Sequence, residues 1–288
     1  MFSNSIRKYS ISCALVCAIV LPFLEARAAC VWKVTGQNGH ILYLGGSMHG
    51  LQSTDYPLPA AYNRAFDLSS RIIFEDDSKG LTPGQLKKLL KSSEYPKNDS
   101  LKNHLDPRVY DYLRRLFAAT SNTPEAQWSR LKPWALLMGL MATGTNSLGV
   151  EVYLTQRARA NRKPIEGLES SREHLEIITG MTDHQAELAL LASFAQATPG
   201  TDKSKSVLDQ WRTGNAEAMA RDLRESYHDL PSFYQRLIVD RNRNWIPIIE
   251  RYLNGRDTCF VVVGAGHIGG PDGVMAMLKA RGYAIEQM

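Results

Sequence analysis

The sequence predicts an α/β fold: a single domain with a central mixed sheet built from two pseudo-repeats, plus a large helical insertion. Strand-like segments cluster near both ends of the chain, with two more near residues 72 and 165. The long stretches between them carry apolar residues at helical spacing. A strand that runs into Gly-x-x-His occurs twice, as "LYLGGSMH" and "FVVVGAGH". This duplication suggests two half-domains that face each other around one site.

The strands are predicted from short apolar or β-branched runs bounded by turn residues. These runs cover residues 31–34, 41–44, 71–77, 164–170, 259–264 and 284–287. The turn residues "GQNG" at 36–39 separate the first two runs, so these two are predicted to form a β-hairpin. The run at 259–264, "CFVVVG", is apolar throughout, which is typical of a strand buried on both faces.

The helices are predicted from apolar residues at 3.6-residue spacing and from cap residues. Helical patterns cover residues 56–70, most of 82–144, 149–163, 170–254 and 271–283. Ser170 with Glu173, and Thr182 with Gln185, have the spacing of capping boxes. The segment "KPWALLMGLMATG" is apolar nearly all round, so a buried helix is expected there.

The domain organisation follows from these elements and from the N-terminus. Residues 1–28 have a basic start, an apolar run of 14 residues and the small residues of "ARA", which together predict a cleaved signal peptide. The run is shorter than the roughly 20 residues that span a bilayer. The rest, residues 29–288, is expected to be one domain with helical insertions at about 80–160 and 170–255. We expect it to be periplasmic or secreted, with anchoring to the inner membrane by the signal as the alternative.

The charge of the chain is mixed, with 34 basic and 29 acidic residues and a formal net charge of +5. The chain has no dense block of lysine or arginine. No nucleic-acid partner is therefore expected. Contact with a membrane is expected only through the signal peptide during export.

Two cysteines, Cys30 and Cys259, remain after the predicted cleavage. Each begins an apolar strand that leads to a Gly-x-x-His motif. If these strands are neighbours, a disulfide bond is geometrically reasonable in an oxidising compartment. The alternative is two buried free thiols.

The candidate site residues follow the ends of predicted strands. His49 and His267 each follow a strand through a glycine-containing turn, and Glu75 ends the strand "RIIFE". Glu166 and Glu169 lie in the next strand segment. Loops at the carboxyl ends of strands build the sites of open α/β sheets. Two histidines and two glutamates give a mixed N/O ligand set that suits a divalent ion such as Zn, Mn, Co or Fe.

The sequence gives less support to the remaining polar residues as members of the site. Arg241 lies on a helix whose Trp245 and Ile249 recur at helical spacing, so it is a surface arginine unless this helix passes the site. No HExxH or GxSxG motif is present. The other histidines are predicted to be surface or packing residues: His40, His104, His174, His184 and His228.

The motifs "YLGGSMHG", "FEDD", "GVEVYL", "DRNRNW" and "FVVVGAGHIGGPDGVMAMLKARGY", in this order, resemble the TraB/GumN family over roughly residues 30–288. That family is related to the Tiki metalloproteases and, more distantly, to erythromycin-esterase and ChaN-like proteins. The resemblance implies a metal-dependent hydrolase fold with an internal pseudo-repeat. Glu151 stands where the family usually has Asp. Matched by position, the implied site residues are His49, Glu75, Glu169, Arg241 with Asn242, and His267.

The leading hypothesis is an exported metal-dependent hydrolase that cuts a peptide or amide bond of a peptide-like substrate. His49 and His267 are expected to ligate or flank the ion. Glu75 and Glu169 are expected to complete the site, one as ligand and one as general base, and Arg241 to hold a substrate carboxylate or an oxyanion. A second hypothesis is a non-catalytic exported protein that binds a peptide or supports envelope polysaccharide production. The third is a metal-free esterase-type hydrolase.

Overall fold

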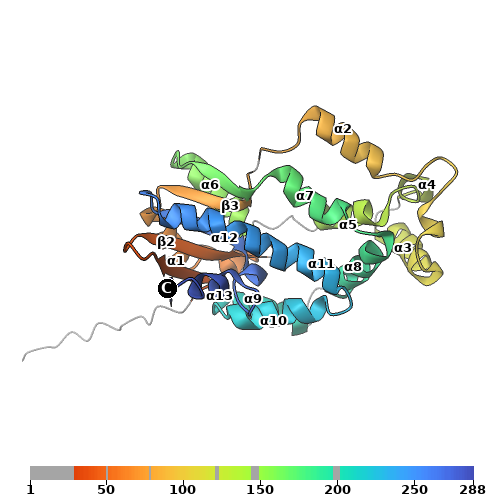
Figure 1. Cartoon of the computed structure of the whole chain (residues 1–288). Coiled ribbons are helices and arrows are strands. Elements are labelled where there is room, and N and C mark those ends of the chain that lie inside the picture. The colour runs from red at the N-terminus through yellow and green to blue at the C-terminus, as the bar shows by residue number, and fades with distance from the viewer. Residues whose placement is uncertain (1–28, 50, 78, 121–122, 144–148, 197–201) are drawn as a thin grey trace, which may run out of the picture.

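A computed structural model of the chain describes residues 29–49, 51–77, 79–120, 123–143, 149–196 and 202–288 (Figure 1). The predicted signal peptide lies outside the described residues. The strands are β1 (Val31–Thr35), β2 (Ile41–Ser47), β3 (Arg71–Asp76), β4 (Ile165–Glu169), β5 (Cys259–Gly264) and β6 (Ala284–Gln287). All six correspond to strand runs predicted from the sequence.

The strands form one six-stranded sheet in the order β4-β3-β5-β2-β1-β6. The four strands β4, β3, β5 and β2 run parallel to one another, whereas β1 is antiparallel to both of its neighbours. The sheet is therefore mixed, and the α/β fold class is confirmed. Because parallel strands end at the same edge, the segments that follow β2, β3, β4 and β5 all start from one edge of the sheet.

The two strands that lead to Gly-x-x-His are direct neighbours. β2 and β5 pair in parallel, with Ser47 opposite Gly264. Every residue of β5 from Cys259 to Val263 is buried, as expected for a central strand covered on both faces. The two motif histidines therefore leave the sheet from adjacent positions, although their backbones then take different paths. His49 is exposed, whereas the 3₁₀ turn η4 (Ala265–His267) folds His267 back into the interior.

The helices lie mainly in two long connections between strands. Between β3 and β4 run α2 (Pro83–Ser92), α3 (Pro107–Thr120), α4 (Glu125–Trp128), α5 (Pro133–Thr143) and α6 (Val150–Ala160). Between β4 and β5 run α7 (Ser171–Thr179), α8 (Asp183–Gln196), α9 (Asp202–Arg212), α10 (Ala216–Ser226), α11 (Pro231–Tyr234), the π-helical turn η3 (Gln235–Val239) and α12 (Asp240–Leu253). Short 3₁₀ turns lie at η1 (Ser53–Asp55) and η2 (Leu101–Asn103), and α1 (Ala60–Leu68) and α13 (Val274–Lys279) precede β3 and β6.

Two separate hydrophobic cores hold these helices. One core surrounds the sheet and includes the buried Trp245 of α12 and Phe260 of β5. The other includes Leu113, Leu137 and Leu190, from α3, α5 and α8. These three helices lie away from the sheet, at the right of Figure 1. Within the described segments, no helix is both long enough and apolar enough to cross a membrane.

Both predicted capping boxes are present. At the start of α7 the Ser170 side chain accepts a hydrogen bond from the Glu173 N–H, and the Glu173 side chain accepts one from the Ser170 N–H. Thr182 and Gln185 make the same reciprocal pair before α8. These bonds satisfy N–H groups that have no partner within the helix. The box at Ser170 also fixes where α7 begins, directly after β4 and beside the edge of the sheet.

The predicted disulfide between Cys30 and Cys259 is wrong, and both thiols are free and buried. Strand β2 lies between β1, which begins directly after Cys30, and β5, which begins with Cys259. The Cys30 carbonyl accepts a hydrogen bond from Gly46 near the end of β2, whereas Cys259 pairs with Leu42 near its start. Because β1 is antiparallel to β2 and β5 is parallel to it, the thiols lie at opposite ends of β2, about 13 Å apart along the strand.

A glycine in β4 sets how closely β3 and β4 approach at the edge of the site. A Cβ at Gly167 would lie 2.2 Å from the Asp77 backbone nitrogen and 2.4 Å from the Asp76 carbonyl carbon. We expect Gly167→Ala to lower the free energy of unfolding by about 1–3 kcal/mol, because backbone atoms must move to admit the methyl group. Gly84→Ala is the control, since an added Cβ there meets nothing within 4 Å. Urea unfolding of both variants checks this prediction, and equal midpoints would contradict it.

Candidate functional site

The candidate site lies at the carboxyl edge of the parallel strands. Glu75 is the last residue but one of β3, and Glu169 ends the neighbouring strand β4. The backbone N–H of Gly264, at the end of β5, donates to Glu75 Oε1 at 2.6 Å. Three strand ends far apart in sequence therefore meet at one point. Glu166, the other candidate glutamate of β4, lies elsewhere: it pairs with Arg71 and accepts a hydrogen bond from the Tyr252 hydroxyl.

Arg241 is buried at the centre of this cluster and is no surface residue. Its Nη2 donates to Glu75 Oε2 at 2.5 Å and to Glu169 Oε1 at 2.8 Å. Its Nε donates to Glu169 Oε2 at 3.2 Å. Its Nη1 contacts the Leu237 carbonyl at 3.2 Å and His267 Nε2 at 3.0 Å. Nη2 also lies 3.2 Å from His174 Nδ1, so six polar contacts surround the five N–H groups of the guanidinium and none of these groups is left over.

Helix α12 positions Arg241 together with Trp245, one turn further along. The guanidinium carbon lies 4.6 Å from the centre of the Trp245 ring, and the Trp245 Nε1–H donates to Glu169 Oε2 at 3.1 Å. Residues four apart lie on the same face of a helix, so the two side chains reach the sheet edge side by side. The turn η3 directly precedes α12 and ends two residues before Arg241, and such π-turns are frequent at functional sites.

His267 is held as a neutral ring. The Asn242 side-chain nitrogen donates to the carbonyls of His267 and Asp272, so its Oδ1 faces the ring and accepts from His267 Nδ1 at 2.7 Å. Nε2 then carries the lone pair that accepts from Arg241. Burial, followed by the charge of Arg241, lowers the pKa of His267 to about 4 against the opposing effect of Glu75.

The pKa of Glu75 is also low. Burial raises it, but the charges of His267 and Arg241 and the N–H of Gly264 outweigh burial and bring it to about 2. Because His267 is neutral above pH 4, Arg241 and Gly264 keep Glu75 ionised at neutral pH. The pKa of Glu169 is lowered as well: burial raises it, and hydrogen bonds from His174 and Arg241 outweigh burial.

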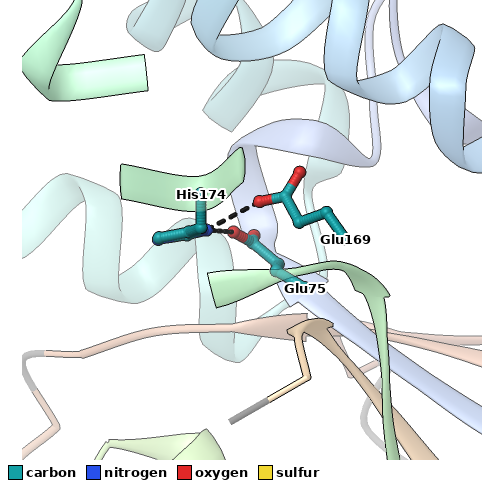
Figure 2. Close-up of side chains that lie close together, drawn as sticks. All are labelled: Glu75, Glu169 and His174. Atoms are coloured by element: carbon teal, nitrogen blue, oxygen red, sulfur yellow. Dashed lines mark hydrogen bonds and ion pairs between the residues drawn. The ribbon is translucent and has the colours of Figure 1, made fainter. Parts of the chain in front are cut away.

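His174 belongs to the site, although the sequence predicted a surface or packing role. Figure 2 shows its ring beside both carboxylates: Nδ1 lies 2.7 Å from Glu169 Oε1 and 4.0 Å from Glu75 Oε2. The hydrogen bond with Glu169 raises the pKa of His174. The signal in the sequence that could have placed His174 in the site is its distance of five residues from Glu169, the end of β4. A helix that begins at a capping box directly after a strand places its first turn over the strand end.

A cavity of about 170 Å³ adjoins the cluster. Its lining residues are His49, Phe74, Glu75, Asp76, Glu151, Thr155 and His174. Of the residues predicted for the site, His49 and Glu75 line the cavity. Glu169, Arg241 and His267 lie in the buried network behind Glu75. The two Gly-x-x-His histidines therefore occupy different environments, in spite of their matching sequences.

Glu151, on α6, is a second cavity residue that the sequence did not place in the site. Burial and then the negative charge of Glu75 raise its pKa, while His49 and the Ser47 hydroxyl act in the opposite direction. Arg241, which pairs with Glu75 and Glu169, has all its N–H groups occupied elsewhere. Burial and the charge of Glu75 therefore favour the protonated form of Glu151.

One group of side chains has the arrangement that a metal ion needs. Single ligand atoms of Glu75, Glu169 and His174 all lie within 4.8 Å of one another. Two carboxylates and an imidazole are a donor set that suits a divalent transition metal ion. The residues present therefore fit such an ion, even though the guanidinium of Arg241 already contacts both carboxylates.

Comparison with known proteins agrees with this architecture. The sequence model of the TraB/PrgY/gumN family matches residues 30–287. The chain belongs to this family. A relative is the protein named Metalloprotease TIKI2 from Danio rerio, which is 23% identical over 303 aligned residues. The alignment covers 85% of this chain and 58% of TIKI2, so the chain spans little more than half the length of that relative.

The buried groups of this TraB/PrgY/gumN site make stability depend on pH. The folded pKa of His267, about 4, lies below the ordinary value of 6.5, so between these values the unfolded chain binds more protons than the folded one. Stability must then rise with pH through this window, by on the order of 3 kcal/mol if the whole shift is expressed. Glu75 acts in the same direction between about 2 and 4.5. His174, whose pKa is raised, opposes them above its ordinary value, where its stabilising contribution is lost as pH rises.

We expect the urea midpoint of the metal-free protein to fall as pH is lowered from 6.5 to 4. His267→Gln should flatten this part of the profile, because glutamine does not titrate. His184→Gln, at an exposed histidine of α8, should keep the wild-type slope. A His267→Gln profile as steep as that of the wild type would contradict the prediction.

Proposed function

We propose that this protein is an exported metal-dependent hydrolase that cuts a peptide or amide bond. The observation that carries the proposal is the convergence of Glu75, Glu169 and His174 beside a cavity that Glu75 and His174 line. The relative from Danio rerio is named a metalloprotease, which supports this reaction class. The basic and apolar pattern of residues 1–28 supports export, to the periplasm or the exterior.

The residues that would hold the ion are Glu75 and His174, with His49 on the cavity wall; Glu169, which completes the converging group, would orient His174 through its hydrogen bond. The identity of the ion is proposed only as far as this donor set goes, to Mn, Co, Zn or Fe. When bound, such an ion supplies Lewis-acid polarisation of a carbonyl oxygen and acidifies water.

The protein's own side chains would do the remaining work. The positive charge of Arg241 keeps Glu75 and Glu169 ionised at the sheet edge. Its hydrogen bonds to both carboxylates also hold these groups in fixed orientations. Glu151 lies in the cavity, and burial and Glu75 shift its pKa upward. A carboxylate tuned in this direction suits general acid–base catalysis near neutral pH. We therefore assign Glu151 the role of accepting the proton of the attacking water and passing it to the leaving amine.

A second candidate is a metal-free hydrolase of the esterase type. The specific observation in its favour is Arg241, whose single positive charge already neutralises part of the Glu75 and Glu169 pair. In such an enzyme Glu151 and a neighbouring histidine would activate water without an ion. The two candidates predict opposite responses to chelation.

Chelation followed by metal return tests the proposal. The protein is dialysed against EDTA, assayed on a mixture of fluorogenic peptides, and then given Mn²⁺, Co²⁺, Zn²⁺ or Fe²⁺ separately. We expect hydrolysis to be lost on chelation and to return with at least one of these ions. Full activity with less than about one ion per ten chains would reject the metal in favour of the second candidate. Absence of hydrolysis under every condition would reject both.

A further inference from the structure

We infer that the site has two layers, and that the second Gly-x-x-His histidine does not touch the ion. This inference rests on the proposed function, because it assigns ligands to the proposed metal. Glu75 and His174 form the ligand layer. Glu169, Arg241 and His267 form the positioning layer, which holds the ligand layer in place. The two layers differ in whether the lone pairs and N–H groups of their side chains are already engaged in hydrogen bonds.

Glu169 has no lone pair left for an ion. Its Oε1 accepts from Arg241 Nη2 at 2.8 Å and from His174 Nδ1 at 2.7 Å. Its Oε2 accepts from Arg241 Nε at 3.2 Å and from Trp245 Nε1 at 3.1 Å. A carboxylate offers about four acceptor positions, and here four N–H groups occupy them. To bind an ion directly, Glu169 would have to give up a hydrogen bond in a buried network, where an unpaired donor is costly.

His267 is saturated in the same sense. Its Nδ1–H donates to Asn242, and the lone pair on Nε2 accepts from Arg241 at 3.0 Å. The ring thereby fixes one end of the guanidinium, while the two glutamates fix the other. Arg241 in turn has no N–H group left for a substrate. Both residues are buried, and neither lines the cavity.

Glu75 and His174 differ from these residues in two respects. Both line the cavity, and both keep an acceptor position. Among the described residues, one N–H donates to each oxygen of Glu75, from Gly264 and from Arg241. His174 Nδ1 lies 2.7 Å from Glu169 Oε1 and 3.2 Å from Arg241 Nη2. When Nδ1–H donates to the carboxylate, the lone pair of the neutral ring lies on Nε2. This is the usual arrangement of a metal-binding histidine, whose second nitrogen donates to a carboxylate that orients the ring.

The duplicated motif therefore has divided roles. The first histidine, His49, reaches the cavity, where it can meet an ion or a substrate. The second, His267, holds Arg241 behind the ligands. Because His267 is occupied by Arg241 and Asn242, the histidine ligand on that side of the site is His174, which comes from α7.

Co²⁺ binding separates the layers. Wild-type protein, His174→Gln, His267→Gln and the exposed control His184→Gln are titrated with Co²⁺ by calorimetry, and bound metal is counted by mass spectrometry. We expect His174→Gln to lose saturable binding. His267→Gln should still bind one ion per chain, with affinity about 10–100-fold weaker, as is typical for groups that orient ligands. The control should match the wild type.

A second measurement needs no variant. In ¹⁵N spectra of the wild-type imidazoles, added Zn²⁺ should shift His174 Nε2, while His267 should keep the pattern of a neutral Nδ1–H ring. Loss of the ion in His267→Gln with its retention in His174→Gln, or a Zn²⁺ shift at His267 Nε2, would overturn the assignment. If wild-type protein binds no ion at all, the proposed function fails first, and the two failures are thus distinguishable.

Discussion

Replacing Glu75 with glutamine is expected to lower kcat/KM for peptide hydrolysis by at least about 10³-fold, because the several kcal/mol of transition-state stabilisation that a bound ion contributes would be lost. Glu75 is the one predicted site carboxylate that both lines the cavity and keeps an acceptor position at each oxygen. Glutamine has nearly the same shape but no charge. Steady-state kinetics with excess Mn²⁺ or Co²⁺, together with metal counting, measures the effect.

The control for this variant is Glu176→Gln. Glu176 lies on α7, two residues after His174, and its side chain is exposed and paired with Arg172. Its replacement should change kcat/KM by less than about twofold, since surface ion pairs contribute little. If Glu75→Gln kept wild-type activity and metal content, Glu75 would be neither a ligand nor a catalytic residue.

Replacing Arg241 with methionine is expected to lower the free energy of unfolding by about 3–5 kcal/mol, because it leaves two buried carboxylates without their counter-ion. The side chain of Arg241 is 7% exposed, and those of Glu75 and Glu169 are 14% and 10% exposed. Methionine preserves most of the apolar packing against Trp245 but none of the five N–H groups. Chemical denaturation at pH 7 measures the loss.

Arg243→Met on the same helix is the matched control. Arg243 is 65% exposed and pairs only distantly with Asp240, at 3.8 Å, so its replacement should cost less than about 1 kcal/mol. Because protonation relieves the repulsion between two unpaired carboxylates, Arg241→Met should lose less stability at pH 4 than at pH 7. Equal losses in the two arginine variants would show that the buried ion pairs do not hold this edge of the sheet.

The sheet and the strand-end residues could be predicted because their signals are local. Apolar runs, the turn "GQNG" and the glycines after β2 and β5 each fix a few neighbouring residues. Glu75 and Glu169 could be proposed as partners because parallel strands end at one edge. The cysteines show where local signals stop. To predict whether a disulfide forms, one must know the order and direction of β1, β2 and β5 in the sheet, and the sequences of the single strands contain neither.

The helical part of the site was harder to predict. Three site residues lie on helices: Arg241 on α12, His174 on α7 and Glu151 on α6. The spacing of apolar residues predicts which face of a helix is buried, but not which turn of the helix lies at the edge of the sheet. His174 was predicted to be a surface or packing residue because it lies in an ordinary helical pattern. Glu151 was noticed only through the family resemblance. The different environments of His49 and His267 depend on the path after the strand, since η4 turns His267 inward, whereas His49 lies in an exposed bend after β2.

The most direct test of the account is a crystal structure of the protein loaded with Co²⁺, with anomalous data collected on both sides of the cobalt edge. We expect one anomalous peak in the cavity, bounded by Glu75 and His174 Nε2, with Glu169, Arg241 and His267 still hydrogen-bonded to one another behind it. A peak bonded to His267, a peak away from the cavity, or no peak in active protein would contradict it.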